Sequence, residues 1–282
     1  MLKLGHKKDH GVDHKCTIRL LDDSEVLECE FQSYHKGRYL LDFVFNKLNL
    51  VETDYFALRY VDQNKQRHWL DPNKNILRQI KRYPTDLSPI LFCFRVKFYP
   101  GDPVRLQEEV TRYQLFLQLR RDLLHGRLYC SQSDAAMLAA YIVQAEIGDF
   151  DPAKHYGNYI SDFKILLKQT PKLEERVMEL HPTLKNYTPL MAETCFLKKA
   201  SALDTYGVDP HPVKDHRGSQ LYLGLNHTGV LTFQGSRKTH HFRWPDVQKL
   251  NYEGKMFIVH LSFAEISHLA LCDDVSTCLL CC

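Results

Sequence analysis

The spacing of apolar residues changes twice along this 282-residue chain, and each change implies a different kind of folded module. Apolar and polar residues alternate near the start, follow a helical spacing between residues 103 and 206, and alternate again beyond Gly207. Alternation is the pattern of half-buried strands, whereas spacings of three and four residues place apolar side chains on one helix face. We therefore expect β-rich modules at both ends of the chain and a helical module between them.

The first module, residues 16–100, reads as a hairpin, a helix and two further strands. Cys16, Ile18 and Leu20 alternate with polar residues before a turn at residues 22–24. This order of elements is that of a ubiquitin-like roll. Residues 1–15 lack periodicity and are expected to form a disordered basic tail. The predicted elements of the module are a hairpin at 16–31, a helix at 40–48 and strands at 55–60 and 91–98.

The middle module, residues 101–206, reads as an all-α bundle of four or more helices. Ser133 is a candidate N-cap for the second helix, and Thr188 followed by Pro189 is a start signal for the last. Gly207 is expected to end that last helix. The predicted helices cover residues 106–124, 134–147, 172–181 and 188–206.

The third module, residues 207–261, reads as five short antiparallel strands of a small sandwich or barrel. The divergent tail at residues 262–282 has no long amphipathic pattern. The predicted strands cover residues 221–225, 230–233, 241–244, 247–252 and 256–261.

Composition restricts the functional classes. The net charge is only +3, so it gives no global argument for a nucleic-acid partner. No apolar run reaches the roughly 18 residues of a membrane helix, and the first residues lack the apolar core of a signal peptide. We therefore expect a cytoplasmic protein. Five cysteines are then expected to be reduced, buried thiols: Cys16, Cys29, Cys93, Cys130 and Cys195.

The sequence offers little support for catalysis or metal binding. None of the predicted helices carries the His-x-x-x-His spacing of a zinc site, and Cys278 with Cys281 forms a single Cys-x-x-Cys pair. No Gly-rich phosphate loop and no nucleophile with a base and an orienting partner is present. We expect no enzyme activity, no metal and no cofactor. Palmitoylation of Cys281 or Cys282 and a tail without function are the two interpretations of the cysteine-rich end.

A series of short blocks, in order from about residue 16 to residue 261, resembles the FERM domain, and most closely its band 4.1 branch. Trp69, a large aromatic side chain beside a turn, is expected to anchor packing at a lobe edge. The blocks are residues 54–58, 69–74, 94–99, 108–113, 116–119, 126–128, 144–151, 206–209, 229–231 and 244–245.

The resemblance implies an α+β multi-lobe fold. Its lobes are a ubiquitin-like roll, an all-α bundle like acyl-CoA-binding protein, and a β-barrel like pleckstrin-homology and phosphotyrosine-binding domains. The barrel is expected to be incomplete, because the family's third lobe has about seven strands and a terminal helix, while the resemblance stops at Leu261. This predicts a truncated or alternatively spliced C-terminus.

The resemblance also implies a function. We expect a non-enzymatic adaptor that links cytoplasmic tails of membrane proteins, and acidic phosphoinositides, to cytoskeletal proteins at the inner face of the plasma membrane and at cell junctions. Two alternatives are the regulatory N-terminal fragment of a FERM-bearing tyrosine phosphatase and a truncated product that binds nothing.

Two sites follow from the resemblance. A partner peptide is expected to add beside the fifth strand of the third lobe. Lipid headgroups are expected in a basic cleft between the first and third lobes, although Asp71 replaces one of its two lysines. The peptide site comprises Met256, Phe257, Ile258, Val259, His260 and Leu261, and the lipid site comprises Lys74, Arg78, Lys81 and Arg82.

Overall fold

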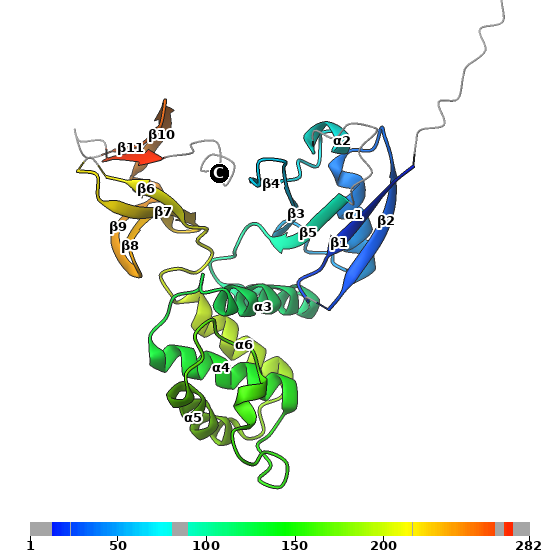
Figure 1. Ribbon diagram of the computed structural model, residues 1–282, viewed down its shortest axis with the longest axis vertical. Helices are drawn as coiled ribbons and strands as arrows, with labels where there is room; N and C mark the ends of the chain where they lie inside the picture. Colours follow the sequence, from blue (N-terminus) through cyan, green and yellow to red (C-terminus); the bar gives the residue numbers. More distant parts are fainter. Residues whose placement is uncertain (1–12, 23, 81–89, 216, 263–267, 273–282) are drawn as a thin grey trace, which may run out of the picture. The chain divides into compact units, whose positions relative to one another are not determined.

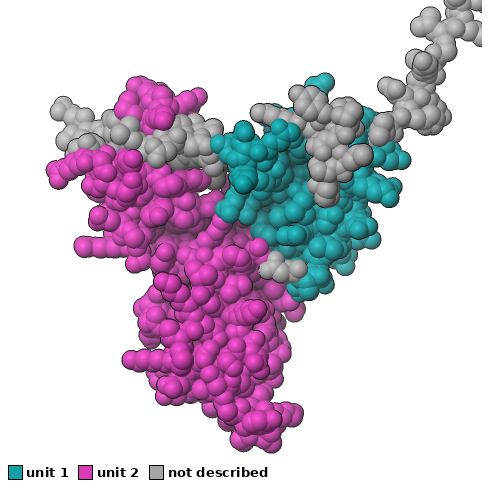
Figure 2. Space-filling model, in the orientation of Figure 1, with its two compact units in different colours: residues 1–95 teal, residues 96–282 magenta. Residues whose placement is uncertain are grey.

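The chain forms two compact units, residues 1–95 and residues 96–282 (Figures 1 and 2). The computed structural model describes residues 13–22, 24–80, 90–215, 217–262 and 268–272. Within the described residues, no helix is long and apolar enough to cross a membrane. The expected series of a mixed α/β lobe, a helical lobe and a β lobe is confirmed.

The first unit is a ubiquitin-like roll with a five-stranded sheet in the order β2-β1-β5-β3-β4. β1 and β2 form the expected hairpin, and β1 also pairs in parallel with β5. The short elements β4 and α2 were not predicted. The elements are β1 Asp13–Arg19, β2 Val26–Gln32, α1 Gly37–Leu48, β3 Phe56–Val61, β4 Arg67–Trp69, α2 Ile76–Gln79 and β5 Ile90–Val96.

Aromatic packing forms the core of this roll. The rings of Phe56 and Phe94 stack at 5.1 Å, and Phe45 from α1 meets Phe94 edge-on at 6.3 Å. Phe92 and Phe94 are fully buried, as their alternation predicts. Phe98 is 52% exposed, because β5 ends at Val96.

The helical lobe begins the second unit, and its helices have clear start signals. The side chain of Ser131, rather than Ser133, caps α4 by accepting a hydrogen bond from the Asp134 amide. Thr188 caps α6 as predicted, but α6 ends at Ser201, and turns lead to Gly207 at φ +69°. The elements are η1 Pro103–Arg105, α3 Glu109–Leu124, α4 Gln132–Ile147, η2 Tyr159–Asp162, α5 Pro171–Leu180, η3 His181–Leu184 and α6 Pro189–Ser201.

The third lobe has seven described strands in the order β10-β11-β12-β6-β7-β8-β9. The prediction of five strands ending at Leu261 was wrong, because β6 and β12 are short segments that pair with each other and so join the two halves of the sheet. The elements are β6 His211–Lys214, β7 Gln220–Asn226, β8 Gly229–Gln234, β9 Arg237–Arg243, η4 Trp244–Asp246, β10 Val247–Glu253, β11 Met256–Leu261 and β12 His268–Cys272.

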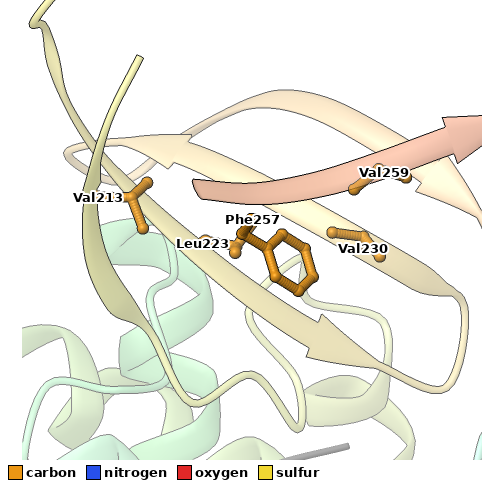
Figure 3. Packing of buried hydrophobic residues seen from close by; sticks show 5 residues of the cluster. All are labelled: Val213, Leu223, Val230, Phe257 and Val259. Atoms are coloured by element: carbon orange, nitrogen blue, oxygen red, sulfur yellow. The ribbon is translucent and has the colours of Figure 1, made fainter. Parts of the chain in front are cut away.

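The core of the third lobe draws on strands from both halves of this sheet. Val213, Leu223 and Val230 from β6, β7 and β8 pack with Phe257 and Val259 from β11 (Figure 3). The sheet therefore curves until its halves face each other, as in a sandwich. Partly buried side chains extend this cluster: Leu221, Leu225, Phe242, Val247, Leu250 and Leu261.

Candidate functional site

The turn after Trp69 accepts hydrogen bonds from the first amides of helix α1. The amide of Gly37 donates to the carbonyl of Lys74 over 3.0 Å, and the amide of Arg38 donates to the carbonyl of Pro72 over 2.9 Å. The first amides of a helix have no partner within the helix. The turn therefore satisfies two donors that helix α1 itself leaves open.

Two further features fix this turn. The side chain of Gln79 bridges it, because its carbonyl oxygen accepts from the Asp71 amide at 2.7 Å and its nitrogen donates to the Asp71 and Lys74 carbonyls at 3.0 Å. Trp69 is half-buried, and the Arg59 guanidinium lies 5.8 Å from the ring centroid. These contacts give the 69–74 segment a structural role at the edge of the first lobe.

The expected lipid-binding residues lie partly in this turn. The ammonium of Lys74 contacts a carboxylate oxygen of Asp71 at 3.0 Å, so its charge is offset locally. Arg78 is exposed on α2, where its amide donates to the N-cap side chain of Asn75. Lys81 and Arg82 lie outside the described residues, as do Cys281 and Cys282. The structure thus puts Lys74 and Arg78 in one short segment of the first unit.

The prediction that a partner peptide adds as a strand beside β11 is wrong. β11 pairs with β10 on one side and with β12 on the other, so an incoming strand finds no open edge there. Phe257, Ile258 and Val259 are 1%, 7% and 3% exposed. The expected residues are therefore interior strand, while Met256, His260 and Leu261 are only half-buried.

Strand β10 occupies one end of the sheet order formed by the described strands, and β9 occupies the other. Val247 and Leu250 on β10 pack against the core cluster, while Lys249 and Tyr252 are exposed. An edge strand presents a row of backbone donors and acceptors that can pair with another chain. The sequence prediction counted the strand at 256–261, β11, as the fifth of this lobe. Because β6 is in fact the first strand, the fifth is β10.

A buried carboxyl group lies where the helical lobe meets the third lobe within the second unit. The Tyr99 hydroxyl donates to Asp122 at 2.7 Å, and the Gln118 side chain donates to its other oxygen at 3.0 Å. Burial raises the pKa of Asp122 above its usual value, against the opposing effects of these donors and of Arg127. This arrangement stabilises the junction.

Tyr206 holds the other side of the junction. Its hydroxyl donates to the carbonyl of Pro100 at 2.7 Å, and its ring meets Tyr99 edge-on at 5.4 Å. A Cβ on Gly207 would lie 2.8 Å from the Cβ of Tyr99, so no larger residue fits. Sequence reasoning missed this junction, because its residues are far apart in the chain.

The described residues show little that could perform chemistry. They contain no group of three or more His, Cys, Asp or Glu side chains that could hold a metal ion. Burial raises the pKa of the Cys16 thiol to about 12 and that of Cys130 to about 11, which makes these thiols poor nucleophiles in the folded state. The binding surfaces are therefore the stronger candidates.

Comparison with family models accounts for the three lobes. The FERM N-terminal domain matches residues 18–82, the FERM central domain residues 102–211, and the FERM C-terminal PH-like domain residues 215–272. The chain belongs to the FERM family. The last match extends beyond Leu261 to the end of β12, in agreement with the strand pairing.

Curated FERM relatives carry names of the band 4.1 group. Human Protein 4.1 is 43% identical over 246 residues, which are 87% of this chain and 28% of that protein. Rat Band 4.1-like protein 1 is 45% identical over 246 residues, 87% of this chain and 27% of that protein. The chain thus spans less than a third of the length of these two relatives.

Solved structures share the fold. The FERM domain of Drosophila Merlin, solved in complex with its C-terminal domain, matches with a TM-score of 0.80 and 24% identity over 95% of this chain and 93% of that chain. Human Myosin 7b, whose MyTH4-FERM domain was solved with a harmonin-a PDZ3 domain, matches with a TM-score of 0.70 and 17% identity over 95% of this chain and 58% of that chain.

Proposed function

We propose that this chain is the FERM portion of a non-enzymatic adaptor that links cytoplasmic tails of membrane proteins to cytoskeletal proteins at the inner face of the plasma membrane. The support is the series of three FERM domain matches and the similarity to Protein 4.1 and Band 4.1-like protein 1. The adaptor needs no cofactor, because its work is binding.

The edge position of β10 carries this proposal. A tail peptide in extended conformation would add as a further strand beside β10, with main-chain hydrogen bonds supplying affinity and side-chain contacts supplying selectivity. Leu250 and Val247 lie at the rim of the core cluster and would pack against apolar side chains of the peptide. Lys249, exposed on the same strand, favours peptides that carry a carboxylate.

Proline replacements on β10 test this site. Successive amides of a strand point to opposite sides, so one of Asn251→Pro and Tyr252→Pro removes an amide that faces the open edge, while the other removes one that faces β11. Binding would be measured by the fluorescence anisotropy of labelled juxtamembrane tail peptides added to the full chain.

We expect the edge-facing replacement to weaken binding at least tenfold while the circular dichroism spectrum stays unchanged. Tyr252→Ala is the matched control, because it removes a side chain and keeps the backbone amide. Tight binding that persists in both correctly folded proline variants would contradict peptide addition at β10.

Attraction to acidic phosphoinositides would add to peptide binding. Each Lys or Arg near an anionic leaflet contributes about 1 kcal/mol. Lys74 and Arg78 would supply part of this, with Lys81 and Arg82 as the further expected contributors. The Asp71 carboxylate beside Lys74 reduces the attraction, so attachment would be weak and sensitive to salt.

A further inference from the structure

Two cysteines of the first unit lie directly opposite each other on neighbouring strands. Cys16 on β1 and Cys29 on β2 are register partners in the antiparallel hairpin. The Cys29 thiol donates to the backbone carbonyl of Glu30 over 3.6 Å, and both cysteines are free. Both side chains are buried on the core face of the sheet, at 3% and 5% exposure. The hairpin thus holds a paired dithiol that the adaptor function does not use.

The backbone geometry of this pair suits a disulfide. Directly opposed residues of an antiparallel pair have Cα atoms about 4.5–5.5 Å apart. Disulfides span Cα separations of roughly 4.4–6.8 Å. Opposed side chains also project to the same face, so the two sulfur atoms approach each other. Rotation about the side-chain bonds is enough to join them.

We propose that Cys16 and Cys29 form a redox-sensitive dithiol, which a low-molecular-weight disulfide such as oxidised glutathione converts into a cross-strand disulfide. In the first step one cysteine thiolate attacks the glutathione disulfide, forms a mixed disulfide and releases one glutathione thiolate. The second cysteine loses its proton, attacks the protein sulfur of the mixed disulfide and releases the second glutathione. The two protons end on the two glutathione molecules.

Cys29 is the favoured first nucleophile. β2 ends the sheet order, whereas β1 is held between β2 and β5. An edge strand opens locally at lower free energy than a central strand, so Cys29 reaches solvent first. Burial raises the pKa of both thiols, which slows attack while the hairpin is closed. Oxidation is therefore expected to follow local opening of β2.

The disulfide would link β1 to β2 directly across the hairpin. Cross-linking restricts the unfolded chain and so stabilises the folded hairpin. The midpoint of thermal unfolding of the first unit should rise by roughly 5–15 °C, and dithiothreitol should reverse the change. The chain would then carry a more stable first lobe under oxidising conditions.

Mass spectrometry of the full chain tests the proposal. The protein is incubated with excess oxidised glutathione under native conditions, remaining thiols are blocked with N-ethylmaleimide, and tryptic peptides are analysed. We expect a linked Cys16–Cys29 peptide that is two hydrogens lighter than the sum of its parts. In Cys16→Ser we expect a stable glutathione adduct on Cys29. Cys130→Ser is the matched control and should form the linked peptide as the natural chain does.

Two outcomes would overturn the proposal. One is glutathione attached to Cys93, Cys130 or Cys195 with no linked peptide from the hairpin. The other is a linked peptide that forms only at denaturant concentrations that unfold the whole first unit, since local opening of β2 would then not be the route. A linked peptide whose formation leaves the unfolding midpoint unchanged would contradict the stabilising effect.

Discussion

Gly37 lies so close to Asp71 that a Cβ on Gly37 would stand 2.5 Å from the carbonyl oxygen of Asp71. The same Cβ would stand 2.9 Å from the Cγ of Leu70. The Asp71 carbonyl accepts a hydrogen bond from the Gln79 side chain and Leu70 is buried, so neither atom can move away freely. The first turn of α1 and the 69–74 segment can therefore pack only around a glycine.

Gly37→Ala should therefore destabilise the first unit by about 2 kcal/mol, even though alanine is the better helix former by about 1 kcal/mol. The steric conflict wins because it includes the backbone carbonyl of Asp71, which is held by the side chain of Gln79. Urea unfolding, followed by circular dichroism, measures the change. Asn46→Ala, at an exposed position of the same helix, should stay within about 0.5 kcal/mol of the natural chain. A stabilised Gly37→Ala variant would show that the turn yields.

The ion pair of Lys74 with Asp71 gives a prediction for membrane attraction. Asp71→Asn removes the carboxylate but keeps a side-chain oxygen that can accept the Asn73 amide, as Asp71 does at 2.9 Å. The freed Lys74 charge should strengthen binding to vesicles containing acidic phosphoinositides about fivefold. Co-sedimentation at low and physiological salt measures the change, and the gain should shrink as salt rises.

The opposite substitution completes this test. Lys74→Glu combined with Arg78→Glu should weaken binding to the same vesicles at least thirtyfold, since each cation contributes about 1 kcal/mol. Phosphatidylcholine vesicles should bind none of the variants. Equal binding by the natural chain, Asp71→Asn and the double glutamate variant would mean that this segment is only solvated surface.

Long periodic elements could be predicted from the sequence, and short ones could not. Helix α1 and the start of α6 appeared at their correct places because a stripe of apolar residues or a Thr-Pro pair marks them. β4 has three residues and β6 has four, which is too short for alternation to be recognised. These strands exist because neighbouring strands pair with them.

Because β6 was not predicted, the peptide-binding site was assigned to the wrong strand. Without β6, the fifth strand of the third lobe is β11, which lies inside the sheet, whereas with β6 it is β10, which lies at its edge. The junction around Asp122 had no local signal at all. Its partner Tyr99 is separated from it by most of α3 and the preceding turns, and only the folded chain brings the two together.

Removing the Tyr99 hydroxyl should destabilise the second unit. Tyr99→Phe leaves one oxygen of the buried Asp122 carboxyl without its 2.7 Å donor, which costs about 1–3 kcal/mol. Because burial already raises the Asp122 pKa and the hydroxyl opposes that rise, the variant should raise it further. A raised folded pKa favours stability at low pH and costs stability as pH rises.

The destabilisation by Tyr99→Phe should thus be larger at pH 7.5 than at pH 4.5. Urea unfolding at the two pH values measures it. Tyr129→Phe, at a half-exposed tyrosine of the same unit, is the matched control and should change little at either pH. An equal loss at both pH values would assign the effect to packing alone.

A buried histidine should make the second unit sensitive to acid. His181 is 0% exposed, and its ring nitrogens lie 2.8 Å from the Gly148 carbonyl and 3.0 Å from the Tyr159 hydroxyl. This pairing assigns the proton of the neutral ring to Nε2, which donates to the carbonyl, while Nδ1 accepts from Tyr159. Burial lowers the pKa of His181, nearby His155 acts in the same direction, and the Gly148 carbonyl and Asp149 oppose them.

Because the folded pKa lies below the unfolded value of about 6.5, stability from neutral His181 is present above that value and is lost as pH falls below it. The free energy of unfolding should decline from pH 7 to pH 5 by up to about 1.4 kcal/mol per pH unit for this one group. His181→Gln should be less stable at pH 7 and should show a shallower decline. His125→Gln, at an exposed position, should keep the slope of the natural chain. Identical slopes in the natural chain and His181→Gln would show that the buried ring does not resist protonation.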